Sequence, residues 1–275
     1  MTDQDEVEIK NNLNVLTSKK LSFREVKVLT YTQFCLACMN RDKKNLLRKN
    51  IISGDVYIIR NAISRVMAKK ILHDITNSNL LLVDLPLILE GVSNLYYESN
   101  NHRKQQGEYN AIDKSWYFFP WNPEQISLHK ILQPIFNNVI LLNNKDPSDV
   151  ISRTPKDGFV QRFHLINYPI DSGEISLHKD PTDIIQVNSG LYLTQFGEDY
   201  HKGGFYVQDR NNLKVNIDEE VEVGDLILFF PGLPHGVSKV EFFDEVGNNK
   251  GRFFLNMSLV DSHHNKRRSK AIGLD

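Results

Sequence analysis

The segment GEISLHKDPTD (Gly173–Asp183) places a histidine and an aspartate two residues apart in a run that has the character of a β-strand. Side chains alternate between the two faces of a strand, so His178 and Asp180 are expected to point to the same side. Pro181 follows directly and ends the run, because proline cannot donate a hydrogen bond to a neighbouring strand. The segment therefore predicts a strand end that presents two metal-ligating side chains on one face.

Short runs of strand-forming residues surround this segment, and turn residues separate them at fairly regular intervals. This pattern is typical of an antiparallel sandwich or barrel such as a jelly roll. The runs are FVQRFHLINYP, ISLHKDP, NSGLYLTQF, GGFYVQD, LKVNI, GDLILFFPG, GVSKVEFF and GRFFLNMSLV. We predict a double-stranded β-helix, or jelly-roll, core over residues 151–262.

The first half of the chain has a different character, with charge-rich and leucine-rich segments in which apolar residues recur at helical spacing. We expect a single domain over residues 1–275, of class α+β. Its parts are a mainly helical N-terminal part over 1–150, the jelly-roll core over 151–262 and a solvated tail over 263–275. The polar stretch 91–115 is interpreted as an irregular loop and a candidate lid over the site.

Composition places the chain among ordinary globular proteins. It has 275 residues, 40% apolar and 24% charged, and a net charge of −1, so no general attraction to nucleic acid or membrane is expected. The start, MTDQDEVEIK, lacks the features of a secretory signal, and the longest apolar run, LLLVDLPLIL, is too short to span a bilayer. We expect a cytoplasmic protein without nucleic-acid or membrane partners; nothing in the sequence indicates its oligomeric state.

Cys35 and Cys38 are the two cysteines of the chain. A C-x-x-C pair can be half of a metal site or a redox motif, but neither a second cysteine pair nor a thioredoxin-like pattern accompanies it. The spacing also fits one face of a helix, so we predict reduced thiols that are buried or half-buried.

A third candidate metal ligand is His235, which follows a Pro-Gly-Leu-Pro turn after the apolar strand GDLILFF. Two histidines and one carboxylate form the facial triad that binds non-haem Fe(II) and leaves coordination positions open. A structural zinc site would normally use four protein ligands. The residues therefore favour an iron site made by His178, Asp180 and His235.

In this order and spacing, the motifs resemble the Fe(II)- and 2-oxoglutarate-dependent oxygenases, over roughly residues 160–260. The resemblance is to the prolyl-hydroxylase-like or phytanoyl-CoA-hydroxylase-like branch. Its HxD motif matches His178-Lys179-Asp180, and its distal histidine matches His235, 57 residues later. The pair Gly203-Gly204 matches a glycine pair common in the family, where glycine lets the chain pass close to a neighbour.

The resemblance also implies residues that hold 2-oxoglutarate. Arg252 begins the next strand, 17 residues after the distal histidine, and a guanidinium pairs bidentately with a carboxylate. By resemblance, Tyr192 is a candidate for the same far carboxylate and Tyr168 for the region near iron. Many family members carry serine or threonine where this chain has Phe254. Two residues on the same strand face are expected to assist instead: Asn256 and Ser258.

Candidate substrate-binding residues precede the triad. Arg162 and His164 share a strand face with Tyr168 and are predicted to project into the pocket. Trp116 and Tyr117, in an aromatic-rich segment, are candidates for the pocket wall. Residues 199–201 are expected to form a polar turn.

The resemblance implies that Fe(II), 2-oxoglutarate and O2 together hydroxylate an unactivated C–H bond, with release of succinate and CO2. A small molecule, such as an amino acid or an intermediate of natural-product biosynthesis, is the favoured substrate. A protein side chain is the alternative substrate, and desaturation or cyclisation is the alternative outcome on the same iron. An alternative of another class is a non-catalytic, cupin-like metal-binding or sensing module.

Overall fold

The structure is a computed structural model that describes residues 21–100, 109–122, 126–148, 158–242 and 251–274. Its first part contains β1 (Val26–Thr30), α2 (Tyr31–Met39), α3 (Arg41–Ile52), β2 (Val56–Arg60), α4 (Arg65–Thr76), β3 (Leu81–Val83), β4 (Leu95–Asn100), β5 (Ala111–Phe118) and α6 (Ile126–Leu142). The second part contains β6 (Phe159–Pro169), β7 (Glu174–Lys179), β8 (Asn188–Tyr192), β9 (Lys202–Gln208), β10 (Lys214–Asn216), a 3-10 turn (Asp218–Glu220), β11 (Leu226–Phe229), β12 (His235–Glu241), β13 (Gly251–Asp261) and β14 (Ile272–Gly273).

Helices α2, α3 and α4 each begin at a residue whose side chain accepts a hydrogen bond from the first turn. Thr30 and Gln33 form a capping box at α2, in which each side chain accepts from the other residue's backbone N–H. At α3 and α4 only one half of this arrangement is present: the Asn40 side chain accepts from the Lys43 N–H and the Ser64 side chain from the Met67 N–H. Caps of this kind each stabilise a helix by about 1 kcal/mol, so the helix starts are encoded locally.

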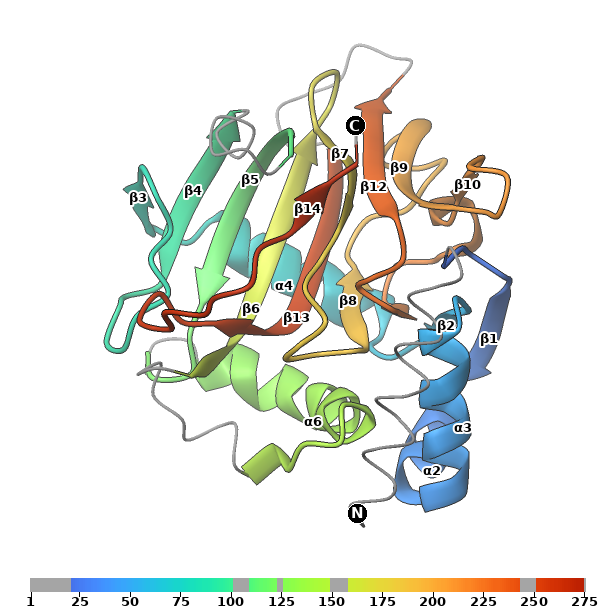
Figure 1. The fold of residues 1–275 in the computed structure, drawn as a ribbon. Coiled ribbons are helices and arrows are strands. Elements are labelled where there is room, and N and C mark those ends of the chain that lie inside the picture. Colours follow the sequence, from blue (N-terminus) through green and yellow to red (C-terminus); the bar gives the residue numbers. More distant parts are fainter. Residues whose placement is uncertain (1–20, 101–108, 123–125, 149–157, 243–250, 275) are drawn as a thin grey trace.

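Two sheets face each other across the middle of the fold (Figure 1). The first has the strand order β1-β2-β11-β8-β13-β6-β5, and β4 and β3 continue it beyond β5. The second has the order β7-β12-β9-β10 and joins the first where Ala111 of β5 pairs with Ile175 of β7. This arrangement confirms the predicted α+β fold with a jelly-roll core.

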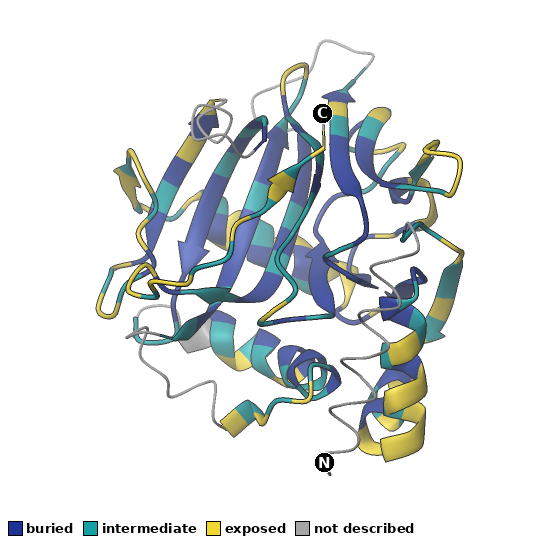
Figure 2. Cartoon of the chain, in the orientation of Figure 1, coloured by how far each residue is buried: buried dark blue, intermediate teal, exposed yellow. Residues whose placement is uncertain are grey.

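The helices cover the outer face of the first sheet. Phe34 of α2 and Leu132 of α6 share one buried cluster with Phe163 and Leu165 of β6 and Leu255 of β13. The alternate residues of β6 and β13 point to the opposite face, toward the second sheet. Figure 2 shows the strands largely buried, while the outward faces of α2 and α3 are exposed. The packed core between the helices and the first sheet therefore closes one side of the space between the two sheets.

The N-terminal part contains more sheet than the sequence predicted. Helices α2, α3, α4 and α6 all lie in it, but so do five strands, β1 to β5. The irregular loop predicted over 91–115 is wrong for the segments that the structure describes, and the candidate lid in the same stretch stays a prediction. There, β4 pairs antiparallel with β5 from Leu95 to Asn100, and only residues 101–108 lie outside the described residues. Backbone pairing with β6 overrides the polar composition of this stretch.

The solvated tail predicted over 263–275 is wrong for its last described residues, where β14 adds to the edge of β7, whereas residues 263–271 are exposed or half-buried. Ile272 pairs with Lys179 and Gly273 with His178, and the Leu274 N–H donates to the Leu177 carbonyl. This edge would otherwise present unpaired backbone groups. The C-terminal segment thus covers the strand that carries the HxD motif.

The two cysteines are reduced, as predicted. Cys38 is buried in α2, Cys35 is half-buried, and burial raises the pKa of the Cys38 thiol to about 12. Among the residues that the structure describes, no helix is long and apolar enough to cross a membrane.

Candidate active site

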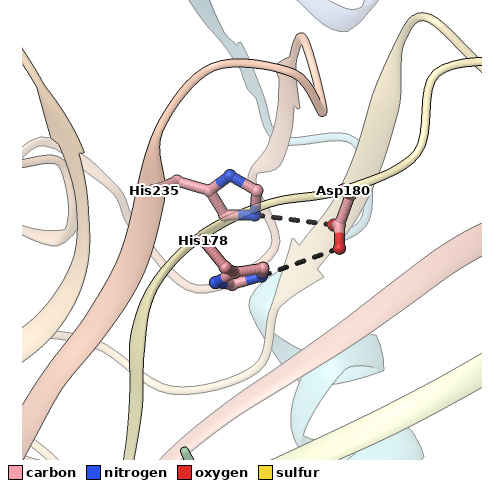
Figure 3. A group of neighbouring side chains, drawn as sticks. All are labelled: His178, Asp180 and His235. Atoms are coloured by element: carbon pink, nitrogen blue, oxygen red, sulfur yellow. Dashed lines mark ion pairs between the residues drawn. The ribbon is translucent and has the colours of Figure 1, made fainter. Parts of the chain in front are cut away.

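The three predicted metal ligands lie together at the junction of β7 and β12 (Figure 3). His178 and His235 face each other as a register pair of the two strands, and Asp180 follows the end of β7. The Asp180 carboxylate lies 3.6 Å from His178 Nε2 and 3.5 Å from His235 Nε2, and one ligand atom from each residue lies within 4.8 Å of the others. The prediction that these side chains meet is thus confirmed by the geometry.

Backbone carbonyls fix both histidine rings in the state that a metal requires. Nδ1 of His178 lies 2.9 Å from the Ser176 carbonyl, and Nδ1 of His235 lies 2.7 Å from the Leu233 carbonyl. A carbonyl oxygen only accepts, so each Nδ1 carries a hydrogen, and in the neutral ring this tautomer leaves the lone pair on Nε2. Such outer hydrogen bonds orient metal-binding histidines and raise their basicity. This donor set fits Fe(II), which two imidazoles and one carboxylate bind in a facial triad.

Aromatic rings hold the histidines in place. The Tyr109 ring stacks on His178 with centroids 4.4 Å apart, and the Phe229 ring meets His235 edge-on at 5.1 Å. Both histidines are buried, whereas the Asp180 side chain is 30% exposed. Solvent or a ligand therefore reaches the triad from the side of the carboxylate.

A cavity of about 130 Å³ extends from the triad between the two sheets. Of the residues predicted from the sequence, the structure brings together at this cavity His178, Asp180, His235, Arg162, His164, Tyr168, Arg252 and Asn256. Arg252 pairs with Tyr168 across β13 and β6, and Asn256 pairs with His164. Asn256 is four positions after Arg252 on β13, so their backbones lie about 13 Å apart at the usual rise of a strand. The two ends of the cavity are therefore chemically distinct.

Four further predicted residues do not line the cavity: Tyr192, Ser258, Trp116 and Tyr117. Ser258 lies beyond it, opposite Arg162 in the β6–β13 pairing, so it is remote from Arg252. Trp116 faces the helices and contacts Tyr96 and Phe253, because it lies on the opposite face of β5 from Tyr117. The Tyr117 ring instead backs the cavity wall, stacked on His164 with centroids 4.1 Å apart.

A buried hydrogen-bond chain orients His164. Ser115 Oγ donates to Asp113 over 2.5 Å, and His164 Nε2 lies 2.8 Å from the same Oγ. A hydroxyl has one hydrogen, which the carboxylate takes, so Oγ accepts from the imidazole N–H. Asp113 and Ser115 were missed because they lie in the stretch interpreted as a loop; the alternation of β5 would have placed both on the cavity side. Together they hold His164 in one orientation at the cavity wall.

Arg252 meets a carboxylate that the sequence did not reveal. Asp218 accepts from Arg252 Nε at 2.5 Å and from Nη2 at 3.1 Å, and the two side chains are 2% and 0% exposed. The hydroxyls of Tyr192 and Tyr200 donate to the same carboxylate at 2.5 and 2.6 Å. We refer to Arg252, Asp218, Tyr192 and Tyr200 as the counter-ion network. Tyr200 is buried, so the prediction of a polar turn at 199–201 is wrong for this residue.

Electrostatics keep this network in one protonation state. Burial would lower the pKa of the Arg252 guanidinium, but the Asp218 carboxylate overcomes that effect and holds it well above its ordinary value. Burial, reinforced by the charge of Asp218, raises the pKa of both Tyr192 and Tyr200 well above their ordinary range. The tyrosines therefore remain neutral donors and the arginine remains charged.

The second glycine of the pair in β9 is explained by this carboxylate, whereas a Cβ at Gly203 would overlap the Lys239 carbonyl. A Cβ added at Gly204 would lie 2.3 Å from Asp218 Oδ2, and the residue has a φ of +98°. The close approach predicted from the sequence is confirmed. We expect Gly204→Ala to lower the free energy of unfolding by about 2 kcal/mol more than Gly197→Ala, because only the former adds steric overlap to backbone strain.

Urea denaturation of the two variants checks this expectation. Gly197 is the matched control, since its φ is +85° and an added Cβ there meets nothing within 4 Å. Equal losses in the two variants would show that backbone conformation, and not contact with Asp218, explains the glycine.

Comparisons with known proteins show the fold. No protein-family model matches the chain, and no curated protein is similar to it in sequence. A prolyl hydroxylase of Trichoplax adhaerens, solved with a peptide fragment of the hypoxia-inducible-factor oxygen degradation domain, is similar at TM-score 0.50 and 15% identity. The match covers 83% of this chain and 96% of that one. At this identity the likeness establishes a shared fold.

Two other solved structures are more distant. A prolyl-4-hydroxylase of Pseudomonas putida has TM-score 0.48 and 12% identity, over 79% of this chain and 98% of that chain. The full-length thymine 7-hydroxylase of Neurospora crassa, in complex with alpha-KG and thymine, has TM-score 0.46 and 12% identity, over 90% and 93% of the two chains.

Proposed function

We propose that this chain is an Fe(II)- and 2-oxoglutarate-dependent oxygenase that hydroxylates an unactivated C–H bond of a small molecule. The observation that carries the proposal is the triad. Nε2 of His178, Nε2 of His235 and the Asp180 carboxylate converge at a cavity between two sheets. Three protein ligands on one side of a metal leave the other side for co-substrate and O2.

His178, Asp180 and His235 would hold the iron. When bound, iron, 2-oxoglutarate and O2 supply the oxidation of the C–H bond, with succinate and CO2 as co-products. The protein contributes position and shielding. The carbonyls of Ser176 and Leu233 orient each neutral imidazole with its hydrogen on Nδ1 and its lone pair on Nε2, and the surrounding rings limit the access of water to the buried side of the site.

The substrate would bind at the end of the cavity that is opposite Arg252. Arg162, His164, Asn188 and Asn256 line it, and the Arg162 guanidinium lies 4.9 Å from the centre of the Tyr117 ring. A cationic group, an oriented imidazole and two amides suit a small polar molecule that carries a carboxylate or a similar anionic group. An amino acid is the substrate class that this lining favours.

The test is 2-oxoglutarate-dependent formation of succinate by Fe(II)-loaded protein under air, with a panel of amino acids. We expect succinate formation to depend on Fe(II) and to be stimulated by the substrate, whose product gains one oxygen atom in mass. Asp180→Ala should reduce the rate by at least about a hundredfold, because it removes a direct ligand of the metal.

Asp183→Ala is the matched control. Asp183 lies three residues on, is exposed, and hydrogen-bonds to Ser269 instead of facing the histidines. Tight metal binding without any succinate formation would reject the proposal in favour of a non-catalytic metal-binding module.

A further inference from the structure

The carboxylate of Asp218 occupies one edge of the Arg252 guanidinium. Its two oxygens accept from Nε and Nη2, at 2.5 and 3.1 Å, which is a bidentate pairing. Without Asp218, the same edge of the guanidinium would be available to bind the carboxylate of a ligand in this bidentate way. Among the described residues, Nη1 takes part in none of these bonds, and Arg252 still lines the cavity.

Asp218 is fixed where it lies. Besides the two bonds from Arg252, it accepts from the Tyr192 and Tyr200 hydroxyls and from the Phe205 backbone N–H, the last at 3.1 Å. The backbone at Gly204 passes so close that a Cβ there would overlap the carboxylate. A carboxylate that accepts this many hydrogen bonds in a buried site costs much to displace.

Two consequences follow for a ligand that enters the cavity. The Arg252–Asp218 pair has no net charge, so this end of the site exerts little attraction on a second anionic group. The Tyr192 hydroxyl, which was expected to bind that group, has already given its one hydrogen to Asp218. What the cavity offers at this end is the part of the Arg252 guanidinium that Asp218 does not engage, with a charge that Asp218 offsets.

We infer that Asp218 is a built-in counter-ion that sets the charge preference for the co-substrate, so that the site binds 2-oxo acids with little preference for a second carboxylate. The inference rests on the proposed function, because it takes the 2-oxo acid to bind at the triad and extend toward Arg252. Asp218 is a positioning residue in this scheme, and it acts on the ligand through Arg252.

Isothermal titration of Mn(II)-loaded protein with two ligands tests the inference without turnover. The ligands are 2-oxoglutarate and 2-oxopentanoate, in which a methyl group replaces the far carboxylate. A free arginine that pairs bidentately with a carboxylate would favour 2-oxoglutarate by about ten- to a hundredfold. For the wild-type chain we expect the two dissociation constants to differ by less than about tenfold.

Asp218→Asn removes the counter-ion charge and keeps its shape. We expect this variant to increase the preference for 2-oxoglutarate by about tenfold or more, because the guanidinium then lacks its internal partner. The same ligand should also raise the melting temperature of the variant more than that of the wild type. Glu220→Gln is the matched control, since it removes one exposed acidic charge from the same turn and should leave the preference unchanged.

The outcomes separate the two proposals. If both 2-oxo acids bind but Asp218→Asn leaves their ratio unchanged, or the wild type prefers 2-oxoglutarate by a hundredfold, the inference about Asp218 is overturned and the proposed function stands. If neither 2-oxo acid binds the metal-loaded wild type, the proposed function fails and the inference fails with it. If the Asp218→Asn variant does not fold, the ratio of the two dissociation constants in the wild type still tests the inference.

Discussion

Replacing His178 with alanine is expected to lower the affinity of the chain for Fe(II) by more than about a hundredfold. Loss of an outer hydrogen bond to a metal-binding histidine typically costs ten- to a hundredfold, and loss of the ligand itself removes a metal–nitrogen bond. The remaining pair, Asp180 and His235, would hold the ion through two ligands only. Anaerobic titration with a competing chelator measures the effect.

The control for this experiment is His264→Ala. His264 is exposed and outside the triad, so its removal should leave Fe(II) affinity unchanged. Thermal denaturation of both apoproteins shows whether the fold is kept. Unchanged Fe(II) affinity in a folded His178→Ala chain would mean that the metal binds elsewhere, and the site assignment would have to be abandoned.

Replacing Arg252 with methionine is expected to lower the free energy of unfolding by about 3–5 kcal/mol. The substitution leaves the Asp218 carboxylate buried at 0% side-chain exposure without its cation. Breaking one partner of a buried ion pair costs this much because the remaining charge has lost its compensation. Urea denaturation at neutral pH measures the loss directly.

A double substitution separates the charge from the packing. Arg252→Met combined with Asp218→Leu removes both charges and should recover part of the loss, since apolar groups of similar size often replace a buried pair without penalty. Recovery is expected to be incomplete, because the Tyr192 and Tyr200 hydroxyls lose their acceptor. A double variant less stable than Arg252→Met would contradict the electrostatic explanation.

An exposed ion pair provides the comparison. Arg65 and Glu198 pair at the surface with side chains 44% and 48% exposed. Water screens such pairs, so Arg65→Met should cost less than about 1 kcal/mol. A similar loss in both arginine variants would indicate that truncation of the long side chain, and not the buried charge, is responsible.

The metal triad was predictable because its information is local. Strand alternation places His178 and Asp180 on one face, and the apolar strand before His235 marks the neighbouring element. Arg252 was predicted from the family resemblance, and the structure places it at the cavity. Strand alternation correctly predicted that Asn256 faces the cavity. It does not indicate how far along the strand the cavity extends, so Ser258 was also predicted to bind the co-substrate, although it lies beyond the cavity.

The errors arose where pairing between distant strands outweighed local composition. The stretch 91–115 is polar and was interpreted as a loop, yet β4 and β5 form there because β6 offers β5 an edge to pair with. Residues 263–275 have the composition of a solvated tail. Only the tertiary structure shows that the edge of β7 lies beside Ile272 and Gly273 and pairs with them. Neither partner strand is adjacent in the sequence.

The sequence did not separate the two faces of β5, because Trp116 and Tyr117 were both assigned to the pocket wall. By itself, it determined the jelly-roll class, the meeting of His178, Asp180 and His235, and the cavity-facing side of β6 and β13. These properties depend on side-chain period and on order along the chain. Only the tertiary structure decided what Arg252 binds, because Asp218 lies 34 residues away in a turn and faces the guanidinium only after β9, β11 and β13 have assembled. The energy of a buried ion pair depends on distance and on exclusion of water, and neither is encoded in the pattern of any one segment.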